Sequence, residues 1–299
     1  MLQKLKENGA KIRYCGKTLN SVRSIDTYPL IQNEVIRTHS SSIQVHDIMT
    51  GTRELPTETT KLQFLTAFET FQSEVGHNPH DPAARPSMIW ELVLAPDGEL
   101  FRQLSIPDEY TRGGYAFRSH DGTPAISATI TPPGTISRPH ICETGTGTLW
   151  MQLFGRNVLI VWPPTRSNLK WFGFAHRIAC GAVFHRALEH LETPECIILE
   201  QGQYEVLGPG YIYGILSATS SAIARVPVVH ESMSADAELA MEWESELVER
   251  RETGTQIEKD TVMGIKSVLR DARLLWRQLD TLQGKLRVEY LVNATNRYG

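Results

Sequence analysis

The sequence lacks the marks of several common protein classes. It has four cysteines, Cys15, Cys142, Cys180 and Cys196, and no two of them form a Cys-x-x-Cys pair. A zinc ribbon or a thioredoxin-like motif is therefore not indicated. The first residues alternate lysine and glutamate with apolar residues instead of opening an apolar signal core, and no run of roughly eighteen apolar residues follows. We expect an intracellular protein, nuclear or cytoplasmic, that is not secreted and has no membrane span.

A basic excess is also lacking. The formal net charge is -4, from 30 Lys and Arg against 34 Asp and Glu. A nucleic-acid-binding protein usually carries a strong basic surplus, so the composition gives no direct nucleic-acid signal. Neither a Gly-x-Ser-x-Gly elbow nor a Gly-rich loop followed by Lys and a helix occurs, so an α/β-hydrolase or a P-loop nucleotide-binding protein is not indicated.

The centre of the chain has the pattern of a β protein. Short apolar or alternating runs bounded by Gly, Pro and Asp turns predict strands, at Ser42–Val45, near Leu30–Ile36, and at Ile89–Leu94, Ala125–Thr131, Thr148–Leu153, Val158–Trp162, Cys196–Leu199, Tyr204–Leu207, Tyr211–Ser217 and Ala222–Val229. The short link at Gly155 and Arg156 reads as a hairpin-like connection.

Four segments change to a helical period. Apolar residues recur every three to four positions, at Lys61–Val75, Ala175–Leu191, Ser234–Glu252 and Asp260–Leu282. The expected organisation is an N-terminal mixed segment, 1–86, that packs on a barrel formed by 87–233. The barrel carries a helical insertion at 166–193, and a helical region, 234–299, follows it.

One stretch resembles a known family. From Pro132 to Thr165 the chain reads PPGTISRPHICETGTGTLWMQLFGRNVLIVWPPT, and a late Gly208-Pro209-Gly210 turn follows the helical insertion. This order is similar to that of JmjC proteins. The resemblance implies a double-stranded β-helix, the jelly-roll barrel of cupins, with helical additions. It also implies Fe(II) and 2-oxoglutarate as cofactors, because JmjC proteins resemble oxygenases that use both.

The metal-ligand positions implied by the resemblance depart from the family pattern. His140 matches the first histidine, but Cys142 stands where the family has a carboxylate, and Tyr213 stands where it has the second histidine. Glu143 is one position off and is expected to point to the other side of its strand, because side chains alternate along a strand. His140, Cys142, Glu143 and Tyr213 are therefore the candidate metal ligands, with His140 the best matched.

The cofactor positions depart as well. The family's Gly-x-Lys turn, whose lysine binds the far carboxylate of 2-oxoglutarate, reads Gly155-Arg156-Asn157 here. Asn157 can form hydrogen bonds but lacks the charge that makes a buried cation a good carboxylate clamp. The resemblance gives Asn157, Thr148 and Trp150 as candidate cofactor-binding residues.

Three hypotheses follow. The first is a catalytically silent JmjC-like scaffold that binds a protein partner, chromatin among the classes implied by the resemblance. The second is an active oxygenase, a protein hydroxylase or histone demethylase, with an unusual site of His140, Cys142 or Glu143, and Tyr213. The third is a cupin that binds zinc through Cys142 and a histidine. The helices at 236–252 and 260–282 are expected either to form a homodimer interface or to pack onto the barrel of their own chain.

Overall fold

The computed structural model describes residues 9–19, 26–39, 43–47, 53–54, 57–59, 61–62, 65–66, 88–94, 98–104, 106–107, 110, 126–137, 139–142, 146–177, 190–228 and 230–251. In chain order its elements are β1 (Lys11–Tyr14), α3 (Thr27–Arg37), β2 (Ile43–Asp47), β3 (Arg53–Glu54), β4 (Met88–Val93), α5 (Glu99–Gln103), β5 (Ser127–Thr131), β6 (His140–Ile141), β7 (Gly147–Phe154), β8 (Arg156–Trp162), α6 (Arg166–Arg177), β9 (Glu195–Glu200), β10 (Tyr204–Leu207), β11 (Ile212–Ser217), β12 (Ser221–Val228), a 3-10 turn (Glu231–Met233) and α8 (Ser234–Arg251). None of the helices in these ranges is both long and apolar enough to cross a bilayer.

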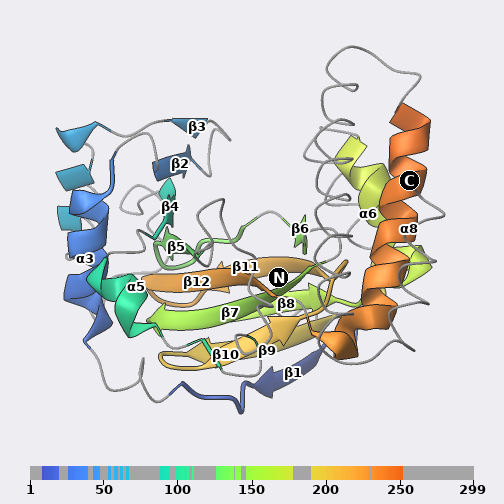
Figure 1. Ribbon diagram of the computed structural model, residues 1–299, viewed down its shortest axis with the longest axis horizontal. Coiled ribbons are helices and arrows are strands. Elements are labelled where there is room, and N and C mark those ends of the chain that lie inside the picture. Colours follow the sequence, from blue (N-terminus) through green and yellow to red (C-terminus); the bar gives the residue numbers. More distant parts are fainter. Residues whose placement is uncertain are drawn as a thin grey trace, which may run out of the picture.

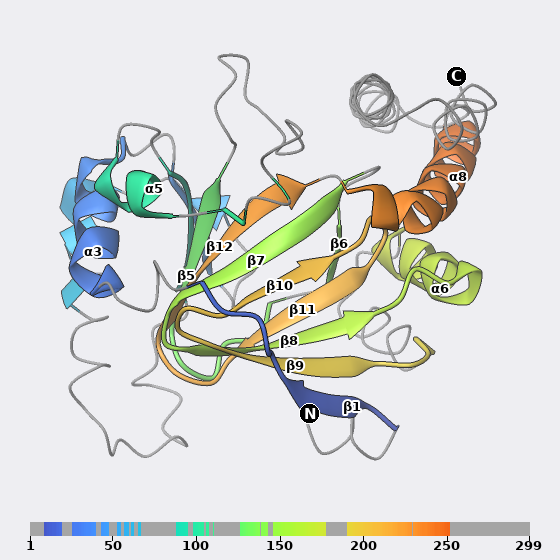
Figure 2. The ribbon, with the colours of Figure 1, turned by 60° about the horizontal axis from the view of Figure 1, so that its bottom comes forward.

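The strands form two facing sheets (Figures 1 and 2). One sheet has seven strands in the order β10-β7-β12-β5-β4-β2-β3, and the other has five in the order β1-β9-β8-β11-β6. Neighbouring strands are antiparallel except for β1 and β9, which are parallel. The N-terminal strands thus extend both sheets beyond the eight strands β5 to β12.

Those eight strands have the topology of a jelly roll. Strands β5, β7, β10 and β12 belong to the larger sheet, and β6, β8, β9 and β11 belong to the smaller one. The chain therefore passes repeatedly from one sheet to the other, and each sheet is built from strands distant in sequence, as in a double-stranded β-helix. The predicted fold class, mainly β with helical additions and a jelly-roll barrel, is confirmed.

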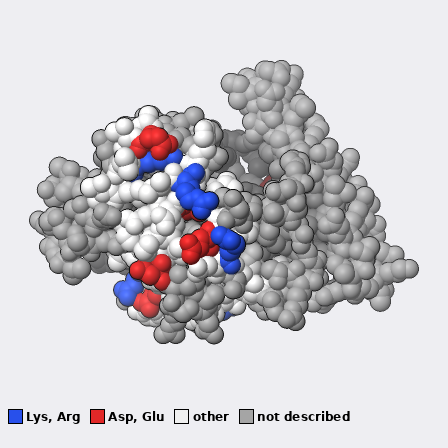
Figure 3. Space-filling view, turned by 60° about the vertical axis from the view of Figure 1, so that its left-hand side comes forward, with Lys and Arg blue, Asp and Glu red and all other residues white. Residues whose placement is uncertain are grey.

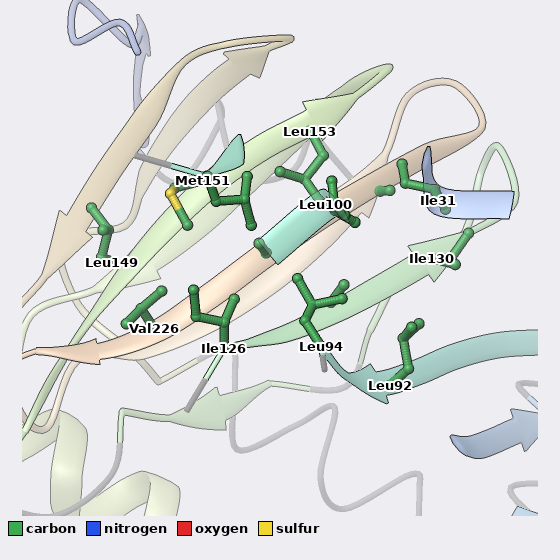
Figure 4. Close-up of a cluster of buried hydrophobic side chains, with 14 of the residues drawn as sticks. Ile31, Leu92, Leu94, Leu100, Ile126, Ile130, Leu149, Met151, Leu153 and Val226 are labelled. Atoms are coloured by element: carbon green, nitrogen blue, oxygen red, sulfur yellow. The ribbon is translucent and has the colours of Figure 1, made fainter. Parts of the chain in front are cut away.

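Three apolar clusters hold the layers together. The outer face of the larger sheet packs against α3 and α5, with Ile31 and Leu100 meeting strand residues such as Met151 (Figure 4). The barrel interior holds a second cluster, which includes Trp150 and Tyr213. The outer face of the smaller sheet packs against α6 through Phe172 and has Trp243 of α8 at its margin. Because β7 is covered on both faces, its residues form a nearly continuous apolar run.

The prediction of a strand near Leu30–Ile36 was wrong, because this segment lies in helix α3. The buried residues of α3 are Thr27, Ile31, Glu34 and Val35. Their spacing of three to four residues follows the helical period, and it places one face of α3 on the larger sheet. The Thr27 hydroxyl donates a hydrogen bond to the Leu153 carbonyl of β7, which fixes the start of the helix on that sheet.

The hairpin-like connection predicted at Gly155 and Arg156 was also wrong. Strand β7 pairs with β10 and β12, while β8 pairs with β9 and β11, so the link is a corner between the two sheets. Gly155 has a φ of 69°, a left-handed conformation that glycine adopts without strain. A one-residue corner with this conformation turns the chain out of one sheet and into the other.

The helices match their predictions in part. Helix α8 begins at Ser234 and ends at Arg251, close to the predicted span. Helix α6 covers 166–177, near the start of the predicted insertion, and Leu191 lies outside any helix. Within the predicted helix Lys61–Val75, the structure describes four residues, all helical. The predicted helix Asp260–Leu282 lies outside the described residues.

Candidate functional site in the barrel

The candidate metal ligands meet where β6 and β11 pair. His140 and Tyr213 are directly opposite each other in this antiparallel pair, and their ring centroids are 5.8 Å apart. Opposed residues share a face of the sheet, and Cys142 lies on that face as well, two residues beyond His140. The Cys142 amide donates to the Tyr211 carbonyl at 2.8 Å, which continues the pairing. The structure thus brings these three residues together, while Glu143 lies outside the described residues.

Burial separates the members of this group. His140 is exposed at the mouth of the barrel, whereas Cys142 and Tyr213 are 1% and 5% exposed and belong to the interior cluster. A metal at this place would have one accessible imidazole and two donors inside an apolar cluster.

Tyr213 is held by two neighbours in the barrel. Its ring packs edge-on against Trp150, with centroids 4.8 Å apart, and Arg225 forms a side-chain hydrogen bond with it. Burial in the barrel raises the pKa of Tyr213 well above its usual range, the nearby Cys142 adds to the rise, and Arg225 only partly opposes it. The phenol is therefore neutral at physiological pH.

Arg225 comes from β12, in the middle of the larger sheet. It lies opposite Trp150 of β7 on one side and Ser127 of β5 on the other, and its Nε donates to the Ser127 hydroxyl at 2.7 Å. Glu91 of β4 is close enough for its charge to raise the pKa of Tyr213 further. Tyr213 is therefore influenced by a cation from one strand and a carboxylate from another, both on the opposite sheet.

The sequence analysis missed Arg225 and Glu91. The predicted strand Ala222–Val229 is a nearly continuous apolar run, and Arg225 is the single charged residue in it. A lone charge on one face of such a strand was the available signal that this face lines a polar pocket. Glu91 lies within the predicted strand Ile89–Leu94 and gave a similar signal.

Of the candidate cofactor residues, Trp150 and Thr148 lie on the same face of β7 as the site. Trp150 is 2% exposed and Thr148 8% exposed. The Trp150 Nε1 is buried and has no hydrogen-bond acceptor among the described residues. A buried donor without an acceptor is unfavourable. The Trp150 N–H is such a donor, and its ring lies next to Tyr213.

Asn157 lies elsewhere, in a buried polar network at the other end of the barrel. Its Nδ2 donates to Gln152 Oε1 at 3.0 Å, and its Oδ1 accepts from the Ser221 hydroxyl at 2.9 Å. Asn157 faces Ser217, which is four residues along β11 from Tyr213, roughly 13 Å at the rise of a strand. The side-chain amide is fully buried and both of its polar atoms have protein partners.

The residues present do not fit Fe(II) and 2-oxoglutarate. A 2-His-1-carboxylate site needs two imidazoles and a carboxylate around one point, and the described side chains offer one imidazole, a thiol and a neutral phenol there. In the part of the chain that the structure describes, no group of three or more His, Cys, Asp and Glu side chains is arranged to hold a metal. The amide of Asn157, bound within its network, is not free to clamp a carboxylate.

On the face shown in Figure 3, the Lys and Arg side chains lie interspersed with Asp and Glu among uncharged residues. This face therefore presents mixed charge.

The chain was compared with known proteins in three ways. No family model matches it, and no curated protein matches it. Among solved structures, it is similar to YcfD, a ribosomal oxygenase from Escherichia coli, with 11% identity, a TM-score of 0.40, and coverage of 80% of this chain and 57% of that one. YcfD in complex with cobalt and succinic acid gives 10% identity, a TM-score of 0.40, and coverage of 87% and 60%.

A third solved structure is Drosophila melanogaster CENP-C bound to CAL1. It gives 10% identity, a TM-score of 0.25, and coverage of 34% of this chain and 60% of that one. The chain thus spans 57–60% of the length of these three structures. The assignment to the jelly-roll fold follows from the strand order of the two sheets.

Proposed function

We propose that this chain is a non-catalytic barrel protein of the JmjC type that serves as a scaffold for binding another protein. The observation that carries the proposal is Tyr213, which occupies the position opposite His140 and is buried against Trp150. In this arrangement the phenol fills the space in which a second imidazole would reach a metal.

The neighbours of Tyr213 support this proposal. Arg225 donates to the phenol and to Ser127, so the pocket has a hydrogen-bond chain of its own. A guanidinium beside the position of the metal would also repel a divalent cation. Cys142, the remaining donor, is 1% exposed and packed in the apolar cluster.

The partner in this proposal is an intracellular protein, nuclear or cytoplasmic, or a peptide segment such as a histone tail. The ring of His140 is exposed, and Arg225 and Glu91 are half-buried. These groups suit a polar peptide side chain, because each charge gives it an oppositely charged or hydrogen-bonding partner.

The test is metal retention by the purified full chain. The wild type is equilibrated anaerobically with Fe(II), Co(II) or Zn(II), with and without 2-oxoglutarate, then desalted, and its metal content is measured by elemental analysis. The comparison is a variant carrying Cys142→Asp and Tyr213→His, which restores the family's ligand types beside His140. His230→Ala, which alters a histidine outside the barrel pocket, is the matched control.

We expect the wild type and the control to retain no more metal than a buffer blank, and the doubly substituted variant to retain more. The alternative, an oxygenase with an unusual site, predicts near-stoichiometric iron in the wild type, better retention with 2-oxoglutarate, and loss of both on His140→Ala. Retention of zinc that depends on Cys142 but not on 2-oxoglutarate would support a zinc cupin. Either of these last two results would overturn the proposal.

A further inference from the structure

Strand β1 leaves one side of its backbone unpaired among the described residues. It is the last strand of the smaller sheet and pairs in parallel with β9. The amides of Lys11 and Cys15 donate to carbonyls on the β9 side, at 3.2 and 2.9 Å. Because backbone groups alternate along a strand, the N–H and C=O groups of Ile12 and Tyr14 point to the other side. β1 therefore presents donors and acceptors at a sheet edge (Figure 2).

The side chains of β1 divide between the two faces of the sheet. Arg13 faces the barrel side, where it contacts Glu195 at 2.5 Å and the buried Glu205 at 2.7 Å. Ile12 and Tyr14 face the outer side and are 48% and 68% exposed. Edge strands in natural proteins are commonly protected by short length, lysine, proline, bulges or inward-pointing charges. β1 is short and begins with a lysine, but its inward charge, Arg13, is paired with acidic side chains, and its outer face is apolar and exposed.

The exposed apolar groups of β1 continue across the sheet. Tyr14 lies beside Ile198, Ile198 beside Val158, Val158 beside Leu216, and Leu216 beside Ile136. This row crosses the outer face of the smaller sheet, and both of its ends are exposed, Tyr14 at 68% and Ile136 at 38%. An apolar row that ends at an open sheet edge suits extension by a further strand with apolar residues on the same face.

We propose that β1 pairs antiparallel with β1 of a second copy of this chain, with a two-fold axis at Arg13. In this register Ile12 lies opposite Tyr14 of the second copy, and Tyr14 lies opposite its Ile12. Both residues point their backbone groups outward, so each opposed pair exchanges two N–H···O bonds. The two smaller sheets would form one continuous sheet, and the apolar rows of the two copies would meet at the axis.

The choice of a second copy as the partner of β1, and the register of the two paired strands, both follow from the self-complementarity of β1. The same four-residue strand supplies outward backbone groups and apolar side chains at matching positions, as a two-fold interface requires. The Arg13 side chains that meet at the axis are each neutralised by Glu195 and Glu205. An axis at Ile12 would instead oppose Lys11 to Arg13 twice, so it would bring together two opposed pairs of cations where the axis at Arg13 brings one, and opposed like charges are unfavourable. This inference does not depend on whether the barrel is catalytic.

The first test is the mass of the full chain measured by sedimentation or light scattering over a dilution series. We expect the wild type to shift from dimer to monomer on dilution. Combined Ile12→Lys and Tyr14→Lys substitutions place charges on the shared apolar face, and they should raise the dissociation constant about tenfold or more. The matched control is Val93→Lys, which alters an apolar strand residue 58% exposed on the other sheet; it should leave the constant unchanged.

The second test fixes the register by cross-linking. Ile12→Cys and Tyr14→Cys are made separately, and each protein is oxidised alone and after mixing with the other. Both positions are exposed, so the substitutions should leave the fold intact. The proposed axis predicts that only the mixture forms a disulfide-linked dimer above the wild-type background. Strong linkage of Ile12→Cys alone would place the axis elsewhere and overturn the register.

Two results would overturn the proposal as a whole. One is a wild type that stays monomeric up to its solubility limit. The other is a dimer whose dissociation constant is unchanged by the paired lysine substitutions, which would indicate another interface, such as the C-terminal helices predicted from the sequence.

Discussion

Replacing Asn157 with alanine is expected to destabilise the protein by about 2 to 4 kcal/mol. The change removes the Nδ2 donor to Gln152 Oε1 and the Oδ1 acceptor for the Ser221 hydroxyl. Gln152 is fully buried, and leaving its oxygen without a donor costs about 1 to 3 kcal/mol. Loss of the second bond and of side-chain packing adds roughly 1 kcal/mol, because Ser221 can turn its hydroxyl to Thr131, 2.8 Å away.

The same network provides a graded comparison. Ser217→Ala removes a bond to Thr131, which keeps its contact with Ser221, so we expect a smaller loss of about 0.5 to 1.5 kcal/mol. Asn157→Lys, which restores the residue type of the JmjC pattern, buries a charge among neutral groups and should destabilise more than Asn157→Ala. Equilibrium urea unfolding followed by tryptophan fluorescence gives all three free energies relative to the wild type.

The reasoning would be refuted by an Asn157→Ala variant within about 0.5 kcal/mol of the wild type, the range of ordinary surface substitutions. It would also be refuted by a stable Asn157→Lys variant that binds 2-oxoglutarate. That result would mean that position 157 faces an open cofactor pocket and that the hydrogen bonds of Asn157 contribute little to the fold.

Two further predictions concern the corner of the barrel and the start of α8. Gly155→Ala adds a Cβ 2.1 Å from the Ser220 carbonyl oxygen at a φ of 69°, so it should lower the free energy of unfolding by at least about 2 kcal/mol. The control is Gly16→Ala, whose added Cβ has nothing within 4 Å and which should be nearly neutral in the same urea unfolding assay. Burial raises the pKa of Asp236, so the native state binds more protons than the unfolded state between its ordinary and raised values, and stability falls as pH rises through that window. Asp236→Asn should therefore be more stable than the wild type near pH 7, and the difference should shrink on acidification; melting temperatures across pH that show the opposite trend would contradict this.

Much of the fold could be predicted because the strands have both faces buried. In β7, β8 and β12 this burial produces apolar runs that the sequence reveals directly, and their bounds differ from the predicted ones by one or two residues. Which strands pair with one another could not be predicted from their order in the sequence. A link as short as Gly155 serves a hairpin or a corner equally well, and the deciding contacts come from β12 and β11, more than fifty residues later in the sequence.

The candidate site shows the same limit of local sequence. Alternation along β6 and the pattern of the late turn grouped His140, Cys142 and Tyr213, which the structure brings together, and their role as metal ligands stays a prediction. Asn157 looked like a ligand position because of its place after Gly155, but its neighbours in the network come from β5, β11 and β12. Such contacts between distant strands depend on the register of the sheets, which local sequence does not specify.

Because Arg225 is hydrogen-bonded to Tyr213, we expect that single substitutions would not create a metal site. Changing Tyr213 to histidine alone removes the acceptor of Arg225 and places an imidazole beside a guanidinium, which disfavours both a bound cation and the protonated ring. Changing Cys142 alone to aspartate buries a carboxylate that lacks a metal partner, and such a charge is costly in an apolar cluster. Only the double substitution gives a metal both an imidazole and a carboxylate at this place, and gives the new carboxylate a metal as its partner. The pocket is therefore stable with the residues it has, and its chemistry is determined by the packing of Tyr213, Trp150 and Arg225.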